Sequence, residues 1–300
     1  MSWSMLNRSW VLYAALVLFI WMSPTHVQLV ANAKAESLSR LTPPMDYFAE
    51  FVNKKEGFDR KKTEDCIYYH RRVIDIIPTQ RAEAYTMLGF CYERAGENAK
   101  AIDAYLRSLK FNPSYFWSDY NIGALYYNQK NYEKARFYLE RATAQDPVRA
   151  SLIPLMSKVY RDVMAGPAAK GFDIGESLAQ GYQRAFILLV LCSQQLRDYP
   201  FMLATALHAS GRGRGGDQVF FYYAAVAAYE MGSFDKAVAL LQKFLGVSPN
   251  STEGMHYLAL SLRAMGQEEA AKGVLAKADR LLAQYGPSLP DLSHAPVQFF

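Results

Sequence analysis

The sequence predicts an all-α solenoid built from repeated helical hairpins, and three observations lead to this fold class. Residues 82–113 align without a gap with residues 116–147, an offset of 34. Within each unit, apolar side chains recur four residues apart, which places them on one helix face. Each unit also ends in a proline, which disfavours helical backbone in the residue before it. A period of this length is typical of stacked hairpins that bury their apolar faces against their neighbours.

Individual positions in the period have separate physical reasons. Small residues are expected where the two helices of a hairpin approach closely, and a glycine just past the first helix suits a left-handed cap. The aligned pairs are Leu88-Gly89 with Ile122-Gly123, Tyr92 with Tyr126, Ala101 with Ala135, Tyr105 with Leu139, Ser108 with Ala142, and Pro113 with Pro147; the cap glycine is Gly96. The spacing therefore predicts two hairpins over residues 82–149.

The same offsets return near the C-terminus and predict two more hairpins over residues 218–285. The matching residues are Ala224-Ala225, Gly232, Ala237, Leu241, Pro249, Leu258-Ala259, Leu262, Gly266, Ala271, Leu275 and Ala278. This pattern resembles the tetratricopeptide-repeat family, with its Leu-Gly, Tyr, close-packing Ala, aromatic residue, second Ala and final Pro. The resemblance covers a little under half of the chain and implies a right-handed superhelical solenoid.

The remaining segments follow this period less closely. Ile153, Met156, Tyr160, Ala169, Ile187, Val190, Leu203 and Leu207 keep it, whereas Asp173 and Glu176 break it. We therefore expect degenerate repeats over residues 150–217, with a loop around 166–175 and a very apolar helix that includes Phe186–Cys192. An N-terminal helix pair over residues 45–80 and an extended tail over 286–300 complete the predicted organisation.

Residues 1–33 have the character of an export signal. Arg8 precedes an apolar run from Trp10 to Met22, and thirteen helical residues reach about 20 Å, short of the roughly 30 Å hydrocarbon core. Ala31-Asn32-Ala33 fits a signal-peptidase site. An uncleaved anchor through residues 10–22 is the alternative. Both interpretations place residues 34–300 outside the cytoplasm, in the periplasm or at the inner membrane facing it.

Resemblance to the family implies that the first helix of each hairpin lines a concave surface. In this chain, aromatic residues dominate the positions that would face inward, and rigid aromatic rings suit the capture of a partner peptide. The predicted groove residues are Phe90, Arg94, Trp117, Tyr120, Asn121, Tyr127, Tyr222, Tyr229, His256 and Arg263, with Ala185, Leu188 and Cys192 from the middle segment. The alternative is that some of these rings pack against neighbouring repeats.

One subset of the family binds the carboxylate end of chaperone tails through a clamp of Lys, Asn and Arg residues. Asn121 matches one clamp position, but Thr86 and Phe90 occupy the positions where Lys and Asn are needed. The resemblance therefore does not extend to that activity.

Several other kinds of chemistry are excluded by composition and spacing. The formal net charge of +5 is mild and spread along the chain, whereas nucleic-acid domains concentrate positive charge on one face. Gly211–Gly216 fits the glycine spacing of a dinucleotide-binding loop, but a helix-like run precedes it instead of a strand. No histidine pair or Cys-x-x-Cys pair has zinc spacing. We therefore expect no cofactor, no metal site and no nucleic-acid partner.

The three cysteines, Cys66, Cys91 and Cys192, are expected to be buried free thiols, because free cysteine behaves as a small hydrophobic residue. Pairing of Cys66 with Cys91 across neighbouring helices is the alternative in an oxidising compartment. His70, beside two arginines, is expected at the surface or at its boundary.

The sequence thus predicts a non-enzymatic scaffold or adaptor of the cell envelope that binds a peptide or helix of a partner protein in its concave groove. A self-assembling structural component and a membrane-anchored assembly factor are the alternatives. A third is an enzyme with buried, converging ionisable groups in the irregular middle segment.

Overall fold

In the computed structural model, the described residues are 60–76, 81–145, 174–211 and 218–286, and helices are the only regular elements within them. In chain order the helices are α4 (Arg60–Ile76), α5 (Arg81–Arg94), α6 (Asn98–Phe111), α7 (Phe116–Asn128), α8 (Tyr132–Ala144), α11 (Ile174–Gln195), α12 (Tyr199–Ser210), α13 (Val219–Glu230), α14 (Phe234–Val247), α15 (Thr252–Ala264) and α16 (Glu268–Tyr285). Several predictions lie outside the described ranges: those for residues 1–33, for residues 45–59 of the N-terminal helix pair, for residues 150–173 of the degenerate repeats and for residues 287–300.

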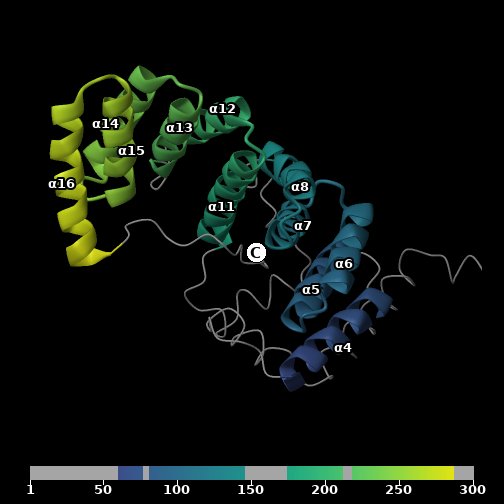
Figure 1. Cartoon of the computed structure of the whole chain (residues 1–300). Helices are drawn as coiled ribbons and strands as arrows, with labels where there is room; N and C mark the ends of the chain where they lie inside the picture. The colour runs from purple at the N-terminus through teal and green to yellow at the C-terminus, as the bar shows by residue number, and fades with distance from the viewer. Residues whose placement is uncertain (1–59, 77–80, 146–173, 212–217, 287–300) are drawn as a thin grey trace, which may run out of the picture.

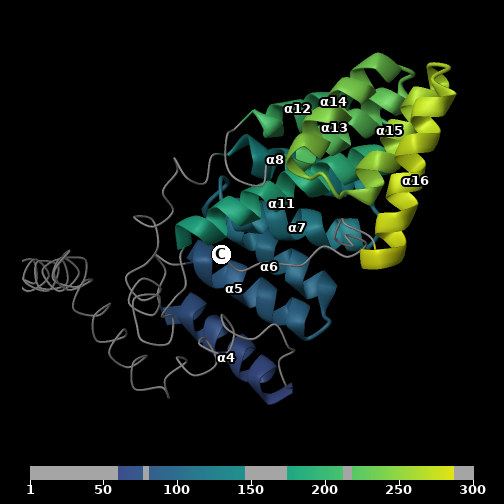
Figure 2. The same ribbon diagram turned by 90° about the vertical axis from the view of Figure 1, so that its left-hand side faces the viewer.

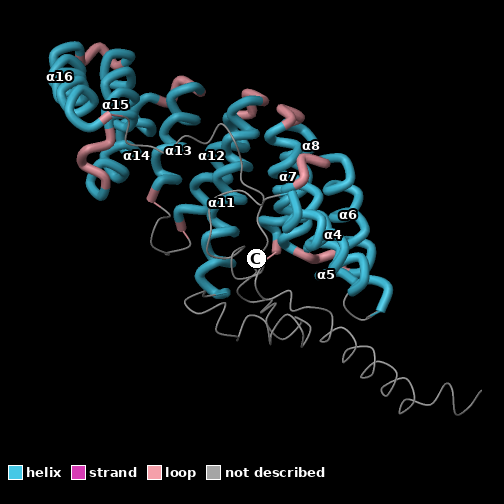
Figure 3. The backbone as a smooth tube through the Cα atoms, turned by 90° about the horizontal axis from the view of Figure 1, so that it is seen from below, coloured by secondary structure: helices cyan, strands magenta, loops and turns pink. Residues whose placement is uncertain are grey.

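The helices form a curved stack in which each packs mainly on its neighbours in the chain. Figure 1 shows this arch, with α5, α7 and α11 toward its inner side, and Figure 3 shows the same arrangement from below. Viewed after a quarter turn, α4 and α16 stand at opposite ends (Figure 2). Helix α11 packs against both α8 and α7, so the stack continues past residues 146–173. The predicted all-α solenoid is confirmed.

Close approach of two helices explains the small residues at the repeated positions. A β-carbon on Gly89 would lie 2.6 Å from the Tyr105 ring, and one on Gly123 would lie 2.7 Å from Leu139. Because real β-carbons do not approach other atoms this closely, each position admits only glycine unless the larger side chain moves. The tight packing expected at these two glycines is confirmed.

The turn inside each hairpin uses a residue in the left-handed region. Gly96, Gly232 and Gly266 have φ values of 76°, 74° and 78°, which glycine adopts at little cost. At the Gly96 turn, the amide of Glu97 donates to the carbonyl of Tyr92 across 2.8 Å. This bond satisfies a carbonyl that the end of α5 would otherwise leave unpaired. The left-handed cap predicted at Gly96 is confirmed.

The middle hairpin, α11 and α12, is shifted by one residue from the predicted period. Its turn bond runs from the amide of Asp198 to the carbonyl of Ser193. Two periods of 34 residues, counted from the equivalent carbonyl of Tyr126, predict residue 194 instead. Met202 and Ala206 consequently fill the close-packing positions and are fully buried, while Leu203 and Leu207 are the less buried neighbours. Placing Leu203 and Leu207 at those positions was wrong by one residue.

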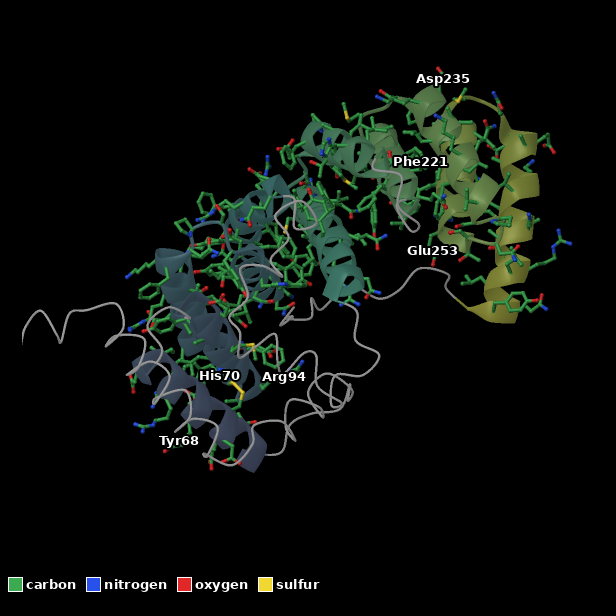
Figure 4. The ribbon with its side chains drawn as sticks, turned by 180° about the vertical axis from the view of Figure 1, so that it is seen from behind. Tyr68, His70, Arg94, Phe221, Asp235 and Glu253 are labelled. Atoms are coloured by element: carbon green, nitrogen blue, oxygen red, sulfur yellow. A yellow bond between two sulfur atoms is a disulfide. The ribbon has the colours of Figure 1, made fainter. Side chains whose placement is uncertain are left out.

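The joint between α4 and α5 differs from the expectation for the cysteines. Cys66 and Cys91 form a disulfide with their Cα atoms 5.9 Å apart. The expectation of free thiols was therefore wrong for this pair, because the packing of α4 on α5 places the two side chains face to face. Cys192 is free and buried, as predicted. His70 is 1% exposed, which corrects its expected surface position; Figure 4 shows it beside the disulfide.

A single apolar core runs through the stack, from Met87 in α5 to Leu241 in α14. Most of it comes from the facing surfaces of neighbouring helices, so no hairpin buries its apolar side chains alone. Within the described ranges, no helix combines the length and apolar character that crossing a membrane requires.

Candidate functional site

The inner wall of the arch is closed over the first two hairpins. Of the predicted groove residues there, Phe90, Trp117, Tyr120, Asn121 and Tyr127 are all less than 10% exposed, and three of these side chains are fully buried. Arg94 alone keeps an exposed side chain, at 39%. The expectation that these five side chains line an accessible surface is corrected: they belong to the core.

Packing explains why this part of the wall is closed. The ring of Tyr182, from α11, packs at a tilt against Phe116 of α7, with ring centres 6.1 Å apart. Its hydroxyl donates to the carbonyl of Thr143 across 2.7 Å. Phe116 in turn packs against Trp117 and Tyr120, with ring centres 5.0 and 6.1 Å apart. The alternative, in which rings pack against neighbouring repeats, therefore describes α7.

A polar cluster closes the wall in the first hairpin. The hydroxyl of Thr86 lies 2.8 Å from that of Ser108 and 2.7 Å from that of Ser118. All three residues are almost completely buried. Because buried hydroxyls are stable only when hydrogen-bonded, this cluster fixes α5 against α6 and α7 and closes the clamp position at Thr86 to a ligand.

The inner wall is accessible instead over α13 and α15. Tyr222 and Tyr229 in α13 are half-buried, His256 is exposed, and the Arg263 side chain is 50% exposed. We call the accessible inner surface the open wall and define it by Tyr222, Tyr229, Glu253, His256, Tyr257 and Arg263. Figure 4 shows Glu253 on the inner side of the arch and Asp235 on the outer side.

The rings of the open wall hold each other in place. Tyr257 contacts both Tyr222 and Tyr229 edge to face, with ring centres 5.9 and 5.7 Å apart. Tyr222 also packs on Phe244, and Tyr229 packs on Phe234, each from the second helix of the same hairpin. The three tyrosines are therefore oriented before any partner arrives, which lowers the entropy lost on binding.

A cavity of about 250 Å³ opens between α13, α15 and α16. Its lining combines aromatic and acidic side chains: Tyr222, Thr252, Glu253, His256, Tyr257, Ala278, Asp279 and Leu282. Burial raises the pKa of the Tyr222 and Tyr257 hydroxyls, and neighbouring tyrosines and Glu253 or Glu230 add to the effect. These rings therefore stay neutral, while the two carboxylates in the lining supply negative charge.

The groove residues predicted in helix α11 are not accessible. Ala185, Leu188 and Cys192 are buried, whereas Ile187 and Leu191 are partly exposed. The one-residue shift of this hairpin rotates the helix face by about 100°, since each helical residue turns by that angle.

Tyr257 belongs to the open wall but was not among the predicted groove residues. It occupies the same place in its repeat as Asn121, which was among the predicted groove residues. Applying the same position to every repeat would have included it. Asp279 and Leu282 come from α16, the second helix of the last hairpin, and no inward-facing position of a first helix would have found them.

Two further features lie at the other end of the arch. A cavity of about 390 Å³ between α4, α5 and α6 is lined by paired charges and two tyrosines, with Arg71 donating to the Tyr92 hydroxyl across 2.6 Å. Nearby, Cys66, His70 and Cys91 place their ligating atoms within 4.8 Å of one another. Burial lowers the pKa of His70 to about 3, so its imidazole is neutral.

Comparison with protein-family models gives three matches, each described as a tetratricopeptide repeat, over residues 82–115, 120–147 and 220–251. The chain is a tetratricopeptide-repeat protein. No curated protein sequence matches it. The family assignment agrees with the two glycine-bearing hairpins and the α13–α14 pair described above.

Among solved structures, this tetratricopeptide-repeat protein is similar to a crystal structure of MamA protein, with a TM-score of 0.52, 16% identity, and coverage of 71% of this chain and 99% of that one. It is similar to the same degree to YrrB, described as a TPR protein with an unusual peptide-binding site, with a TM-score of 0.52, 16% identity, and coverage of 72% and 93%. At this identity the likeness shows the fold. Proteins of this repeat family are generally interaction modules without catalytic activity, which supports a protein-interaction scaffold.

Proposed function

We propose that this chain is an exported, non-catalytic scaffold that holds a segment of a partner protein against the open wall. The observation that carries the proposal is the ordered tyrosine cluster of α13 and α15 beside a cavity of about 250 Å³. Half-exposed, pre-oriented tyrosines offer large contact area with little further loss of entropy.

The chemistry of the cavity favours a basic anchor from the partner. Glu253 and Asp279 line it together with the faces and edges of Tyr222 and Tyr257. A lysine or arginine side chain gains from carboxylates by charge attraction and from aromatic faces by cation–π contact. We propose a partner segment that inserts one basic side chain here and lays apolar side chains along α13 toward Ile187 and Leu191.

Export is the second part of the proposal. It rests on the apolar run and small-residue site within residues 1–33, and the Cys66–Cys91 disulfide supports it, because stable disulfides belong to oxidising compartments. We propose a place in the cell envelope facing the periplasm. N-terminal sequencing of the exported protein tests the form it takes: a start at Lys34 supports a cleaved signal, whereas a start at Met1 supports an anchor.

Binding is tested with the full-length chain and a displayed library of twelve-residue peptides. Selected peptides are expected to be enriched in lysine or arginine next to apolar residues. Tyr257→Ala should weaken their affinity at least tenfold, a loss of about 1.4 kcal/mol that is ordinary for a central aromatic contact. Glu253→Gln should weaken basic peptides more than their neutral variants. Fluorescence anisotropy measures each affinity.

The matched control is Phe137→Ala, because Phe137 is 55% exposed on α8, away from the open wall. Its affinities should equal those of the unchanged chain. Equal binding by the Tyr257→Ala and Glu253→Gln variants, or loss of binding with Phe137→Ala, would place the partner surface elsewhere.

A further inference from the structure

The joint between α4 and α5 carries three metal-ligating side chains that the proposed scaffold function does not use. Cys66 and His70 stand one turn apart on the same face of α4, and Cys91 faces them from α5. Each of the three is 1% exposed, and their ligating atoms lie within 4.8 Å of one another. Helices α4 and α5 therefore bring two sulfurs and one imidazole close together.

This set of ligands matches one class of cation. Two thiolates and one imidazole suit zinc, which is bound by sulfur at about 2.3 Å and by nitrogen at about 2.0 Å. Two thiolates also neutralise a divalent cation, and neutrality matters because an uncompensated charge is costly at a buried position. Solvent would supply a fourth ligand, as it does at zinc sites with three protein ligands.

We propose that Cys66, His70 and Cys91 form a zinc-class site in the reduced protein, and that the Cys66–Cys91 disulfide is the metal-free form of the same site. A dithiol reductant supplies two electrons and two protons, which convert the disulfide to two thiols while the reductant becomes a disulfide. Binding of the divalent cation then forms two metal–sulfur bonds and one metal–nitrogen bond, and the two thiol protons pass to solvent.

Both forms would join α4 to the first repeat. The disulfide connects the helices covalently, and the cation would connect them through its ligands. Only the reduced, metal-free protein lacks both of these links, so the proposal makes the docking of α4 tighter with metal than without it when the thiols are reduced.

The test uses the full-length chain, reduced with dithiothreitol, freed of the reductant without oxygen, and titrated with Co²⁺. One equivalent of Co²⁺ should produce thiolate-to-cobalt charge-transfer absorption and the intense visible bands of a tetrahedral ion, and Zn²⁺ should remove both. The oxidised protein should show neither. Absence of these bands in the reduced chain overturns the proposal.

Variants assign the ligands. Cys66→Ser and His70→Asn should each weaken Co²⁺ binding by more than the roughly 10- to 100-fold typical of losing a mere supporting contact. Cys192→Ser and His208→Asn are the matched controls and should bind as the unchanged chain does, since Cys192 is buried in α11 and His208 is exposed on α12. Unchanged binding by His70→Asn, or loss of binding with Cys192→Ser, contradicts the assignment.

Thermal unfolding separates ligand loss from misfolding. Zn²⁺ should raise the Tm of the reduced unchanged chain, because a ligand that binds only the folded state stabilises it. It should leave the Tm of His70→Asn unchanged while circular dichroism shows that variant to be helical. An equal rise in both proteins would show that the cation binds elsewhere and would overturn the proposal.

Discussion

Asp119 is a buried carboxyl in the second hairpin, with its side chain 0% exposed. The side-chain amide of Gln145 donates to it across 2.9 Å, and Nε of Arg141 lies 3.4 Å from its other oxygen. Burial nevertheless raises its pKa to about 7, since loss of water penalises the charged form more than these two partners favour it. The group therefore makes the stability of the fold depend on pH near neutrality.

The direction of that dependence follows from proton linkage. Between the ordinary pKa of 3.8 and the folded value of about 7, the folded state keeps a proton that the unfolded state releases. The stability that Asp119 contributes through this proton is fully present below pH 4 and is lost as pH rises through 7. The free energy of unfolding of the unchanged chain should therefore fall as pH rises over this range. Asp119→Asn should reduce that fall by a few kcal/mol, at about 1.4 kcal/mol per unit of pKa.

Urea unfolding of both proteins at pH 4.5 and pH 8 measures the difference. Asp103→Asn is the control, because the Asp103 side chain is 62% exposed and should leave the pH dependence as it is. If the free energy of unfolding falls equally between pH 4.5 and pH 8 in the unchanged chain and in Asp119→Asn, Asp119 is ionised throughout this range.

Single elements of the solenoid depend on their caps. Ser251 precedes α15, and its hydroxyl accepts a hydrogen bond from the amide of Gly254 across 3.2 Å. Ser233 precedes α14 without a side-chain cap bond. Two serines at the same place in neighbouring helices thus provide a natural comparison.

Ser251→Ala should lower the free energy of unfolding by about 1 kcal/mol, the usual worth of a serine cap. Ser233→Ala should change it by less than about 0.5 kcal/mol, as expected for a surface substitution that breaks no such bond. Chemical unfolding of both variants measures the two effects. If both variants lose the same free energy of unfolding, the cap hydrogen bond of Ser251 does not explain the effect of Ser251→Ala.

Element positions were predictable in the clear repeats but not in the middle one. Gly89 and Gly123 could be aligned because only glycine tolerates the 2.6 to 2.7 Å approach found there. In the α11–α12 hairpin, Val190 and Leu191, or Met202 and Leu203, are apolar neighbours. Hydrophobicity alone cannot choose between two adjacent apolar residues, so the one-residue shift was invisible in the sequence.

At the scale of the whole molecule, the described helices form a linear array in which each packs mainly against those next to it in the chain. Such a solenoid opens locally, with each repeat stabilised by its own contacts and by those of the adjacent repeats. The open wall and the α4–α5 joint lie in separate parts of this array. A destabilising substitution in one should therefore leave the local stability of the other unchanged.

Leu241→Ala tests this independence, since Leu241 is fully buried in α14. The change should cost about 2–5 kcal/mol locally. Hydrogen exchange should accelerate in α13, α14 and α15 while α5 and α6 keep their protection. Val247→Ala, at a position that is 55% exposed in the same helix, should change neither region. Uniform acceleration along the chain would show one cooperative unit instead.

From the sequence alone came the repeat fold, the close-packing glycines, the left-handed cap at Gly96 and the aromatic character of α13. Each depends on local periodicity or on the backbone freedom of one residue, which the chain carries without tertiary context. Burial of Trp117 and Tyr120, the pairing of Cys66 with Cys91, and the opening of the wall at Tyr257 were decided only by tertiary structure. All three depend on how neighbouring helices cover one another. The repeat pattern predicts which way a side chain faces, but it does not predict whether another helix already occupies the space that the side chain faces.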